Sequence, residues 1–448
     1  MLDKLAAVSQ KITPGLRKVI GNTIWLSGDQ ILRLFIGLLV GRLVADYLAP
    51  YQFGLYNVSL AWAGLFGPIA KLGLDNIVVR DLTREPSVKN EILGTAFVLK
   101  VIGAVATLVL SIVAITLIKS PDSDVTSLLV AIVAAATIFQ SFETVDFWFQ
   151  SQVQAKYTVW ARTAAVLVIS IVRIAFIQMR FPLVAFAWAM FAENILIAIG
   201  LVVVYQKNGN SIKLWTGSVE RGKALVKESW PLILSGMVIM IYMRIDQIML
   251  QQMKNAEAVG LYAAAVKPSE MWYFVPTAIV NSVTPSIVKA KAAGEKIYYE
   301  RIQTLFNLVV LLSYAVAIPI TIFSSQIIMI VAGKKYIEAA PVLEVLVWAG
   351  LFVSLGLARV PWLITEGFMK FSAVTTAIGA LINVVLNLLL IPSYGGLGAG
   401  IATVIAQFFA AYGAGAFYPK TRKIFIQQTK ALFMIDVFKM LIKKLKGL

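Results

Sequence analysis

The chain has 448 residues, of which 59% are hydrophobic and only 14% charged, and it contains neither cysteine nor histidine. Soluble domains average about 25% charged residues, so this composition excludes a soluble enzyme and indicates a polytopic membrane protein. Without Cys and His, disulfides, Cys/His zinc sites and histidine-based catalytic triads are also excluded. The net charge of +17 fits either the positive-inside bias of a membrane protein or an anionic cargo.

Apolar segments long enough to cross a bilayer recur along the whole chain. A membrane-spanning helix needs about 20 mostly apolar residues. The sequence therefore predicts an all-α fold of about twelve transmembrane helices. In chain order they are 22–45, 51–79, 93–118, 127–149, 158–178, 183–205, 229–252, 259–287, 303–323, 341–365, 372–391 and 399–418.

The distribution of Lys and Arg between the loops predicts the orientation of these spans. With the N-terminus in the cytoplasm, the inner segments hold 26 basic residues and the outer loops hold 5. Short cytoplasmic loops carry an excess of Lys and Arg, so both termini are expected on the cytoplasmic side. The outer loops are too short for an extracytoplasmic catalytic domain, and the inner loops contain no P-loop, so we expect no enzyme activity.

Two short motifs recur about 207 residues apart. Leu26-Ser27-Gly28 recurs as Leu234-Ser235-Gly236, and Gly54-Leu55-Tyr56 recurs as Gly260-Leu261-Tyr262. Because six spans separate the copies, both halves start from the same side of the membrane. The pattern predicts two six-helix parallel pseudo-repeats around a central cavity, an architecture common among transporters.

This repeat also predicts the domain boundaries. We expect an N-terminal six-helix half (1–205), a basic cytoplasmic linker (206–228), a C-terminal six-helix half (229–418) and an amphipathic basic tail (419–448). In the tail, Ala431, Ile435, Phe438, Ile442 and Leu445 repeat at helical spacing beside several lysines. This combination of an apolar stripe and lysines is typical of a helix that lies on an anionic membrane surface.

Charged residues inside the spans are the candidate functional residues. Each costs roughly 2.5–3.5 kcal/mol at a bilayer centre, so they should face a protein interior or a water-filled cavity. One interpretation is interhelical ion pairing or snorkelling, first for Lys71, Arg162 and Arg173. The other is a cationic cavity for phosphate or acidic sugars. The nine basic residues are Arg33, Arg42, Lys71, Lys100, Arg162, Arg173, Arg244, Lys267 and Arg359.

Acidic residues in the spans have a similar ambiguity. Asp246 and Glu270 are candidates to bind a coupling proton or Na⁺, and ion pairing is the alternative for each. Asp29 lies one helical turn from Arg33, and Glu143 lies one turn from Asp146, so each pair shares a helix face.

An ordered series of motifs runs along most of the chain: 50–56, 73–82, 93–100, 146–150, 243–250, 259–262, 270–276, 379–387 and 390–392. This series resembles the Wzx-type polysaccharide flippases of bacteria, within the multidrug/oligosaccharidyl-lipid/polysaccharide exporter superfamily. The sequence departs from the family pattern at Asp46, where Arg is frequent, and at Lys267, which replaces Arg.

The resemblance implies a transporter of the bacterial cytoplasmic (inner) membrane that moves undecaprenyl-diphosphate-linked oligosaccharides to the outer leaflet by ion-coupled alternating access. It implies no cofactor or nucleic acid, and as partners a lipid-linked anionic oligosaccharide, membrane lipids and polysaccharide polymerase or assembly proteins. The expected substrate-binding residues are Arg244, Lys100, Lys267, Arg42, Arg33 and Arg359, and the coupling or ion-pair candidates are Asp246, Glu270, Asp29, Asp146 and Glu143.

Three other functions have to be weighed. A drug/cation antiporter of the same superfamily predicts a cavity rich in carboxylates, and the nine cations in the spans argue against it. A membrane polysaccharide polymerase or ligase needs a large outer loop, which is lacking. A major-facilitator transporter shares the six-plus-six repeat, but this chain lacks a Gly-Arg-basic run after its second span.

Overall fold

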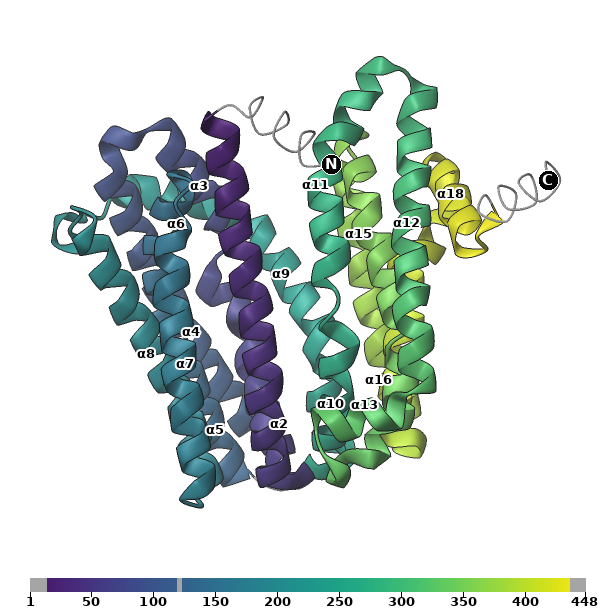
Figure 1. Ribbon diagram of the computed structural model, residues 1–448, viewed down its shortest axis with the longest axis horizontal. Coiled ribbons are helices and arrows are strands. Elements are labelled where there is room, and N and C mark those ends of the chain that lie inside the picture. Colours follow the sequence, from purple (N-terminus) through teal and green to yellow (C-terminus); the bar gives the residue numbers. More distant parts are fainter. Residues whose placement is uncertain (1–13, 119–122, 436–448) are drawn as a thin grey trace, which may run out of the picture. The chain divides into compact units, whose positions relative to one another are not determined.

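The computed structural model describes residues 14–118 and 123–435, and every regular element in this part of the chain is a helix (Figure 1). The described residues form two compact units. Of the described residues, unit 1 draws on those in 14–47 and 62–240, and unit 2 on those in 48–61 and 241–435. The all-α prediction is confirmed. The end of the predicted amphipathic tail, 436–448, lies outside the described residues.

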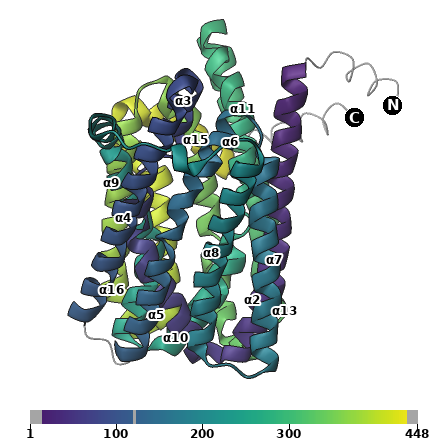
Figure 2. The same cartoon turned by 90° about the vertical axis from the view of Figure 1, so that its left-hand side faces the viewer.

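Unit 1 consists mainly of long helices joined by short turns. Figure 2 shows α7 and α8 packed side by side, and α5 also contacts α8. The elements are α2 (Pro14–Lys71), α3 (Asp75–Arg84), η1 (Pro86–Val88), α4 (Lys89–Leu117), α5 (Ser123–Ala136), η2 (Phe139–Glu143), α6 (Thr144–Ser151), α7 (Lys156–Gln178), α8 (Leu183–Lys207), η3 (Ile212–Leu214) and α9 (Val219–Met253), the last of which continues into unit 2.

Unit 2 has more breaks, several of them next to proline or glycine. Its elements are α10 (Ala256–Glu270), α11 (Phe274–Ala293), α12 (Glu295–Ile322), α13 (Ser324–Val331), η4 (Lys334–Ala339), α14 (Ala340–Leu346), α15 (Ala349–Thr365), α16 (Met369–Phe408), the π-helical η5 (Phe409–Gly413), α17 (Ala414–Phe417), η6 (Pro419–Thr421) and α18 (Arg422–Leu432).

All twelve predicted spans fall on helices. The ranges of α2 and α16 each comprise two helical segments that meet at a residue with non-helical backbone angles, Ala49 (φ 56°) and Gly395 (φ 55°). Each range covers one predicted span and the first part of the next. By length and composition, seven helices of the described residues could cross a membrane, or eight if the bent pair Lys334–Leu346 and Ala349–Thr365 is one span. Some helix ranges contain parts of two predicted spans, and other predicted spans are divided between helices. The count of seven or eight helices is therefore consistent with the twelve predicted spans.

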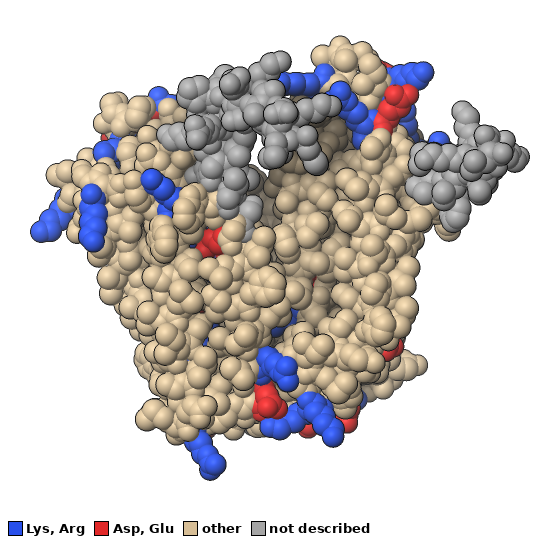
Figure 3. Space-filling view, viewed as in Figure 1, with Lys and Arg blue, Asp and Glu red and all other residues tan. Residues whose placement is uncertain are grey.

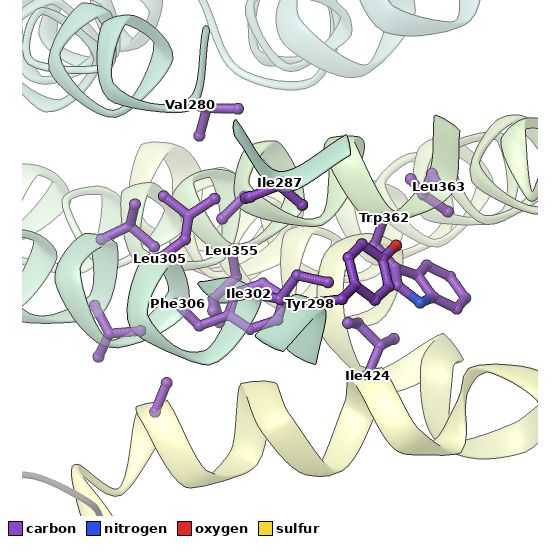
Figure 4. Close-up of a cluster of buried hydrophobic side chains, with 14 of the residues drawn as sticks. Val280, Ile287, Tyr298, Ile302, Leu305, Phe306, Leu355, Trp362, Leu363 and Ile424 are labelled. Atoms are coloured by element: carbon purple, nitrogen blue, oxygen red, sulfur yellow. The ribbon is translucent and has the colours of Figure 1, made fainter. Parts of the chain in front are cut away.

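Each unit has its own apolar core. In unit 2, Val280, Leu305 and Leu355 pack in one cluster with Tyr298 and Trp362 (Figure 4). In unit 1, α3, α4, α6 and α8 contribute the corresponding cluster. On the face shown in Figure 3, most Lys and Arg side chains lie near the helix ends and the surface between them is almost uncharged. That band is the surface expected of helices in a bilayer.

The predicted linker 206–228 is folded onto unit 1. The Arg221 guanidinium donates to Glu91 (2.9 Å) and Glu85 (3.1 Å). Arg80 binds Glu228 and Asp81, and these hydrogen bonds, first that of Glu228, raise the pKa of the Arg80 guanidinium above its ordinary value. Contacts therefore group 206–240 with unit 1 and 48–61 with unit 2. The predicted halves 1–205 and 229–418 describe the sequence repeat, and that repeat stays a prediction.

The repeated Gly-Leu-Tyr motifs meet inside unit 2. A Cβ atom on Gly54 would lie 1.7 Å from the carbonyl oxygen of Ala256, and a Cβ on Gly260 would lie 1.9 Å from the carbonyl oxygen of Pro50. Only glycine permits two helices to approach so closely. The glycine of each motif is therefore required where the start of α10 packs on the segment of α2 that belongs to unit 2.

Candidate functional site

A buried carboxylate on α9 gathers polar side chains from three other parts of unit 2. Asp246 is 3% exposed and accepts hydrogen bonds from the Asn387 amide (2.6 Å), the Tyr262 hydroxyl (2.7 Å) and the Thr403 hydroxyl (2.7 Å). The Asn387 amide also donates to Asn383 Oδ1 (3.1 Å), one helical turn away on α16. Asp246 thus lies where α9, α10 and both arms of α16 converge.

The charge of this Asp246 network is not balanced by a base. Among the described residues, no Lys or Arg forms an ion pair with Asp246. A buried carboxylate without a counter-charge costs several kcal/mol (about 3–5 when one partner of a buried pair is removed). The Asn387 Oδ1 atom is also buried without a hydrogen-bond donor. One carboxylate surrounded by amide and hydroxyl oxygens suits a monovalent cation or a proton.

The network does not suit a multivalent metal. Within the described residues, no group of three or more Asp or Glu side chains lies close enough to hold a metal ion. Among the described residues that these hydrogen bonds join, Asp246 supplies the one carboxylate.

Two other predicted residues lie near Asp246 in unit 2. Arg244 and Glu270 are half-buried and interact electrostatically, and neither forms an ion pair within 4 Å in the part of the chain that is described. Lys267, one turn before Glu270 on α10, is exposed. The Arg244 guanidinium is therefore not neutralised by a carboxylate within 4 Å in the described residues, and Glu270 is its electrostatic neighbour.

Unit 1 holds a second charged network, in which positive and negative groups balance. Lys100 on α4 is 1% exposed, with its Nζ 3.6 Å from Glu143 and 4.9 Å from the centre of the Phe147 ring. Arg162 on α7 bridges Glu143 (3.6 Å) and Asp146 (3.1 Å). Two cations and two carboxylates thus link α4, η2, α6 and α7.

Unit 1 has two further ion pairs, one within α2 and one between α7 and α8. Arg33 binds the buried Asp29 (2.6 Å), which also accepts a hydrogen bond from Thr163 (2.7 Å). Arg173 binds Glu193 (2.7 Å) across α7 and α8. Arg162 and Arg173 therefore form ion pairs, which was one of the alternatives considered for them together with Lys71.

Besides Arg244, three more intramembrane cations, Arg42, Lys71 and Arg359, form no ion pair with a carboxylate in the described residues. Arg42 and Lys71 are exposed on α2. Arg359 on α15 is 3% exposed, donates to the carbonyl of Ala410 (3.1 Å) and lies 5.6 Å from the centre of the Phe371 ring. That carbonyl belongs to the π-helical η5, so Arg359 satisfies a main-chain acceptor inside unit 2.

The structure thus groups the predicted residues by unit: Asp29 with Arg33, Lys100 with Glu143 and Asp146, and Arg244 with Glu270 beside Asp246. Their roles in binding or coupling stay predictions. Sequence reasoning missed the partners of Asp246, namely Tyr262, Asn383, Asn387 and Thr403. Asn383 and Asn387 lie four residues apart in a strongly apolar segment, and that spacing was the available signal.

Comparison with known sequences gives a family match over more than half of the chain. The family model described as polysaccharide biosynthesis protein matches residues 19–291, and the MatE model matches residues 231–389. A curated relative, the uncharacterized membrane protein MJ1068 of Methanocaldococcus jannaschii, is 31% identical over 121 residues, or 27% of this chain. The match covers 22% of that relative's length.

Solved structures with the same fold match nearly the whole chain. An inward-facing multidrug resistance MATE family transporter of the MOP superfamily has a TM-score of 0.74 at 14% identity, covering 93% of this chain and 99% of that one. The lipid II flippase MurJ in an inward closed conformation has a TM-score of 0.66 at 14% identity, covering 94% and 93%. A MOP superfamily transporter from Pyrococcus furiosus, described by the reverse polarity of its binding pocket, has a TM-score of 0.60 at 15% identity, covering 96% and 99%.

Proposed function

The chain belongs to the polysaccharide biosynthesis protein family and has the fold of MOP-superfamily transporters, and on that premise we propose that it is a flippase for lipid-linked oligosaccharides. It is a multi-pass membrane protein. The proposed substrate is an oligosaccharide on undecaprenyl diphosphate, carried from the cytoplasmic to the outer leaflet of a bacterial inner membrane. Both termini are proposed to be cytoplasmic.

One observation carries the substrate class: some cations in the spans are not neutralised. Arg33, Lys100, Arg162 and Arg173 form ion pairs with carboxylates, whereas Arg42 and Arg244 form none in the described residues. A guanidinium without a carboxylate partner retains the planar donor fork that binds diphosphate or acidic sugars bidentately. We therefore assign anion binding to Arg244 first and to Arg42 second.

Ion coupling is the second part of the proposal, and the Asp246 network supports it. Its carboxylate has three hydrogen-bond donors and, in the part of the chain that the structure describes, no basic ion-pair partner, so a cation or proton there would remove an uncompensated charge. Asp246 is separated from Arg244 by a single residue of α9. Binding of the ion would therefore alter the field at the proposed substrate-binding arginine.

Complementation of a flippase-deficient bacterial strain that makes a defined acidic repeat unit tests the proposal. The wild-type chain should restore surface polysaccharide, and Arg244→Gln should abolish it at equal protein abundance in the membrane. The matched control is Lys370→Gln, an exposed cation of unit 2 with the same loss of charge. Full export by Arg244→Gln would remove this residue from the mechanism, and failure of the wild type with every acidic repeat unit tried would contradict the flippase assignment.

The MatE match and the MATE neighbour favour one alternative, a drug/cation antiporter of the same superfamily. It predicts that the wild-type chain raises resistance to cationic drugs in a strain lacking its own exporters, and that Arg244→Gln leaves this resistance intact. A cationic cargo would be repelled by Arg244, whereas the proposed anionic cargo needs it. Drug-resistance assays on the same set of strains therefore separate the two functions.

A further inference from the structure

Helix α18 has one face that is locked into unit 2. Ile424, Gln428 and Ala431 are buried, and α18 contacts α12 and α17. The Gln428 amide donates to the carbonyls of Leu355 (3.4 Å) and Ala411 (3.2 Å), so it joins α15 to the π-helical η5.

Further hydrogen bonds hold the middle and the C-terminal end of α18. The Gln427 amide donates to the carbonyl of Tyr299 (2.8 Å), and the Tyr314 hydroxyl donates to the carbonyl of Leu432 (2.9 Å). Both tyrosines belong to α12. The helix is therefore held in one orientation, and the residues on its other face are presented at fixed positions.

That other face combines cations with large apolar side chains. Lys420, Arg422, Lys423 and Lys430 are exposed, and the segment 414–435 contains no acidic residue. Among these cations only Lys423 has an acidic neighbour in the described residues, Glu295 at 3.8 Å, and both of those side chains are 60% exposed.

The apolar side chains lie among these cations. Phe417 is 81% exposed, and Ile426 and Phe433 are exposed as well. Phe417 ends α17, at the end of the last predicted span, so this apolar surface continues the lipid-facing surface of a membrane helix.

We propose that the exposed face of residues 417–433 binds anionic phospholipid headgroups of the adjacent leaflet, which the loop charges predict to be the cytoplasmic one. Basic residues beside exposed aromatic and aliphatic side chains bind at an anionic membrane interface, because the apolar groups enter the acyl boundary while the cations remain at headgroup level. A soluble acidic protein would match the charges but would have to displace lipid from Phe417. Through Gln428, the bound lipid would hold η5, and with it the end of the last span, at the membrane surface.

The test compares lipids on the full-length purified protein. Dissociation constants for phosphatidylglycerol and phosphatidylcholine with identical acyl chains are measured by native mass spectrometry. The variant carries Lys420→Gln, Arg422→Gln and Lys423→Gln. The matched control carries Lys207→Gln, Lys213→Gln and Lys223→Gln, which remove the same charge from exposed positions of unit 1.

Wild type and control should bind phosphatidylglycerol at least tenfold more tightly than phosphatidylcholine, and the α18 variant should lose that ratio. Each basic residue near an anionic surface contributes about 1 kcal/mol, or roughly fivefold per charge. The preference should also fall at 1 M salt, where screening acts within about 3 Å. An unchanged unfolding temperature in lipid-free detergent would show that the variant is folded.

Three results would overturn the proposal. The α18 variant could retain the wild-type ratio, or the unit 1 control could lose as much of it. Alternatively, the wild type could retain an acidic polypeptide in place of phosphatidylglycerol and lose it in the α18 variant, which would assign this face to a protein partner.

Discussion

Asp246 accepts three hydrogen bonds from neutral donors, and no basic side chain of the described residues balances its charge. If a monovalent cation supplies the balance, replacing choline chloride by sodium chloride should raise the unfolding temperature of the purified protein. At a sodium concentration 100 times the dissociation constant, binding would raise the free energy of unfolding by about 2.7 kcal/mol. Asp246→Asn should abolish this sodium effect because the amide offers no charge to bind the ion.

Glu344→Gln is the control for that experiment, because Glu344 is another carboxylate of unit 2 that accepts a hydrogen bond from a hydroxyl, that of Ser324 (2.7 Å). This variant should keep the sodium effect. If the balancing charge is a proton, stability should instead depend on pH in the wild type and lose that dependence in Asp246→Asn. A wild-type protein that responds to neither sodium nor pH would contradict the coupling role.

The Lys100 network allows a structural role to be separated from substrate binding. Lys100→Met leaves Glu143 with Arg162 alone. Removing one partner of a buried pair costs up to about 3–5 kcal/mol, and the remaining Arg162 contact (3.6 Å) should keep the loss towards the lower end. The double variant Lys100→Met/Glu143→Gln should recover much of this stability, since it removes both charges. The unfolding temperature in detergent measures each change.

Translocation by that double variant then decides the role of Lys100. Restored stability with full polysaccharide export would show that Lys100 acts only within its ion pairs. Restored stability with no export would support the predicted contact between Lys100 and the anionic substrate.

At the scale of single residues, the sequence predicted the charges in the spans but not their partners. Hydropathy identifies Asp246 and Arg162 because a charge in an apolar segment is conspicuous. Tyr262 and Thr403 lie 16 and 157 residues from Asp246, and neither residue type is unusual in a membrane helix. Such a network depends on which helix faces meet, and one sequence does not contain that information.

At the scale of helices, the packing of α2 on α10 can be tested at the contact between the two Gly-Leu-Tyr motifs. Gly54→Ala and Gly260→Ala place a Cβ within 2 Å of a carbonyl oxygen, so the two helix segments must move apart. Overpacking of this kind costs typically about 1–3 kcal/mol. We expect both variants to show lower unfolding temperatures and reduced amounts in the membrane.

Gly64→Ala is the matched control on the same helix, because nothing lies within 4 Å of the Cβ it would add. Alanine is a better helix former than glycine by about 1 kcal/mol, so this variant should be as stable as the wild type or more stable. Equal stability of all three alanine variants would contradict the close approach of α2 to α10.

The elements themselves were largely predictable, because a span is a local property of 20 or so residues. The ends of the spans were less so: the predicted span 51–79 runs past the end of α2 at Lys71 and into α3, which begins at Asp75. The linker 206–228 looked like a loop because it is polar and basic, yet its charges bind Glu85 and Glu91. Composition does not distinguish a solvated charge from one paired across a fold.

At the scale of the whole molecule, orientation in the membrane is predicted from the unequal distribution of basic residues. The predicted inner segments hold 26 Lys and Arg and the predicted outer loops hold 5. Basic residues near span ends are retained on the cytoplasmic side during insertion. The same charges account for much of the net charge of +17, so a basic chain does not by itself indicate an anionic cargo; the unpaired Arg244 is the stronger argument for one.

The absence of cysteine makes this orientation directly measurable, because a single introduced cysteine is the only thiol in the protein. In intact cells, a membrane-impermeant maleimide should label Arg180→Cys and Lys334→Cys, which are exposed in predicted outer loops. Lys213→Cys and Lys370→Cys, exposed in predicted inner segments, should be labelled only after permeabilisation. The predicted loops alternate between the two sides of the membrane along the chain. Labelling of Lys213→Cys in intact cells would therefore reverse the proposed direction of transport. Labelling of Lys370→Cys alone would change the number of spans after Lys334.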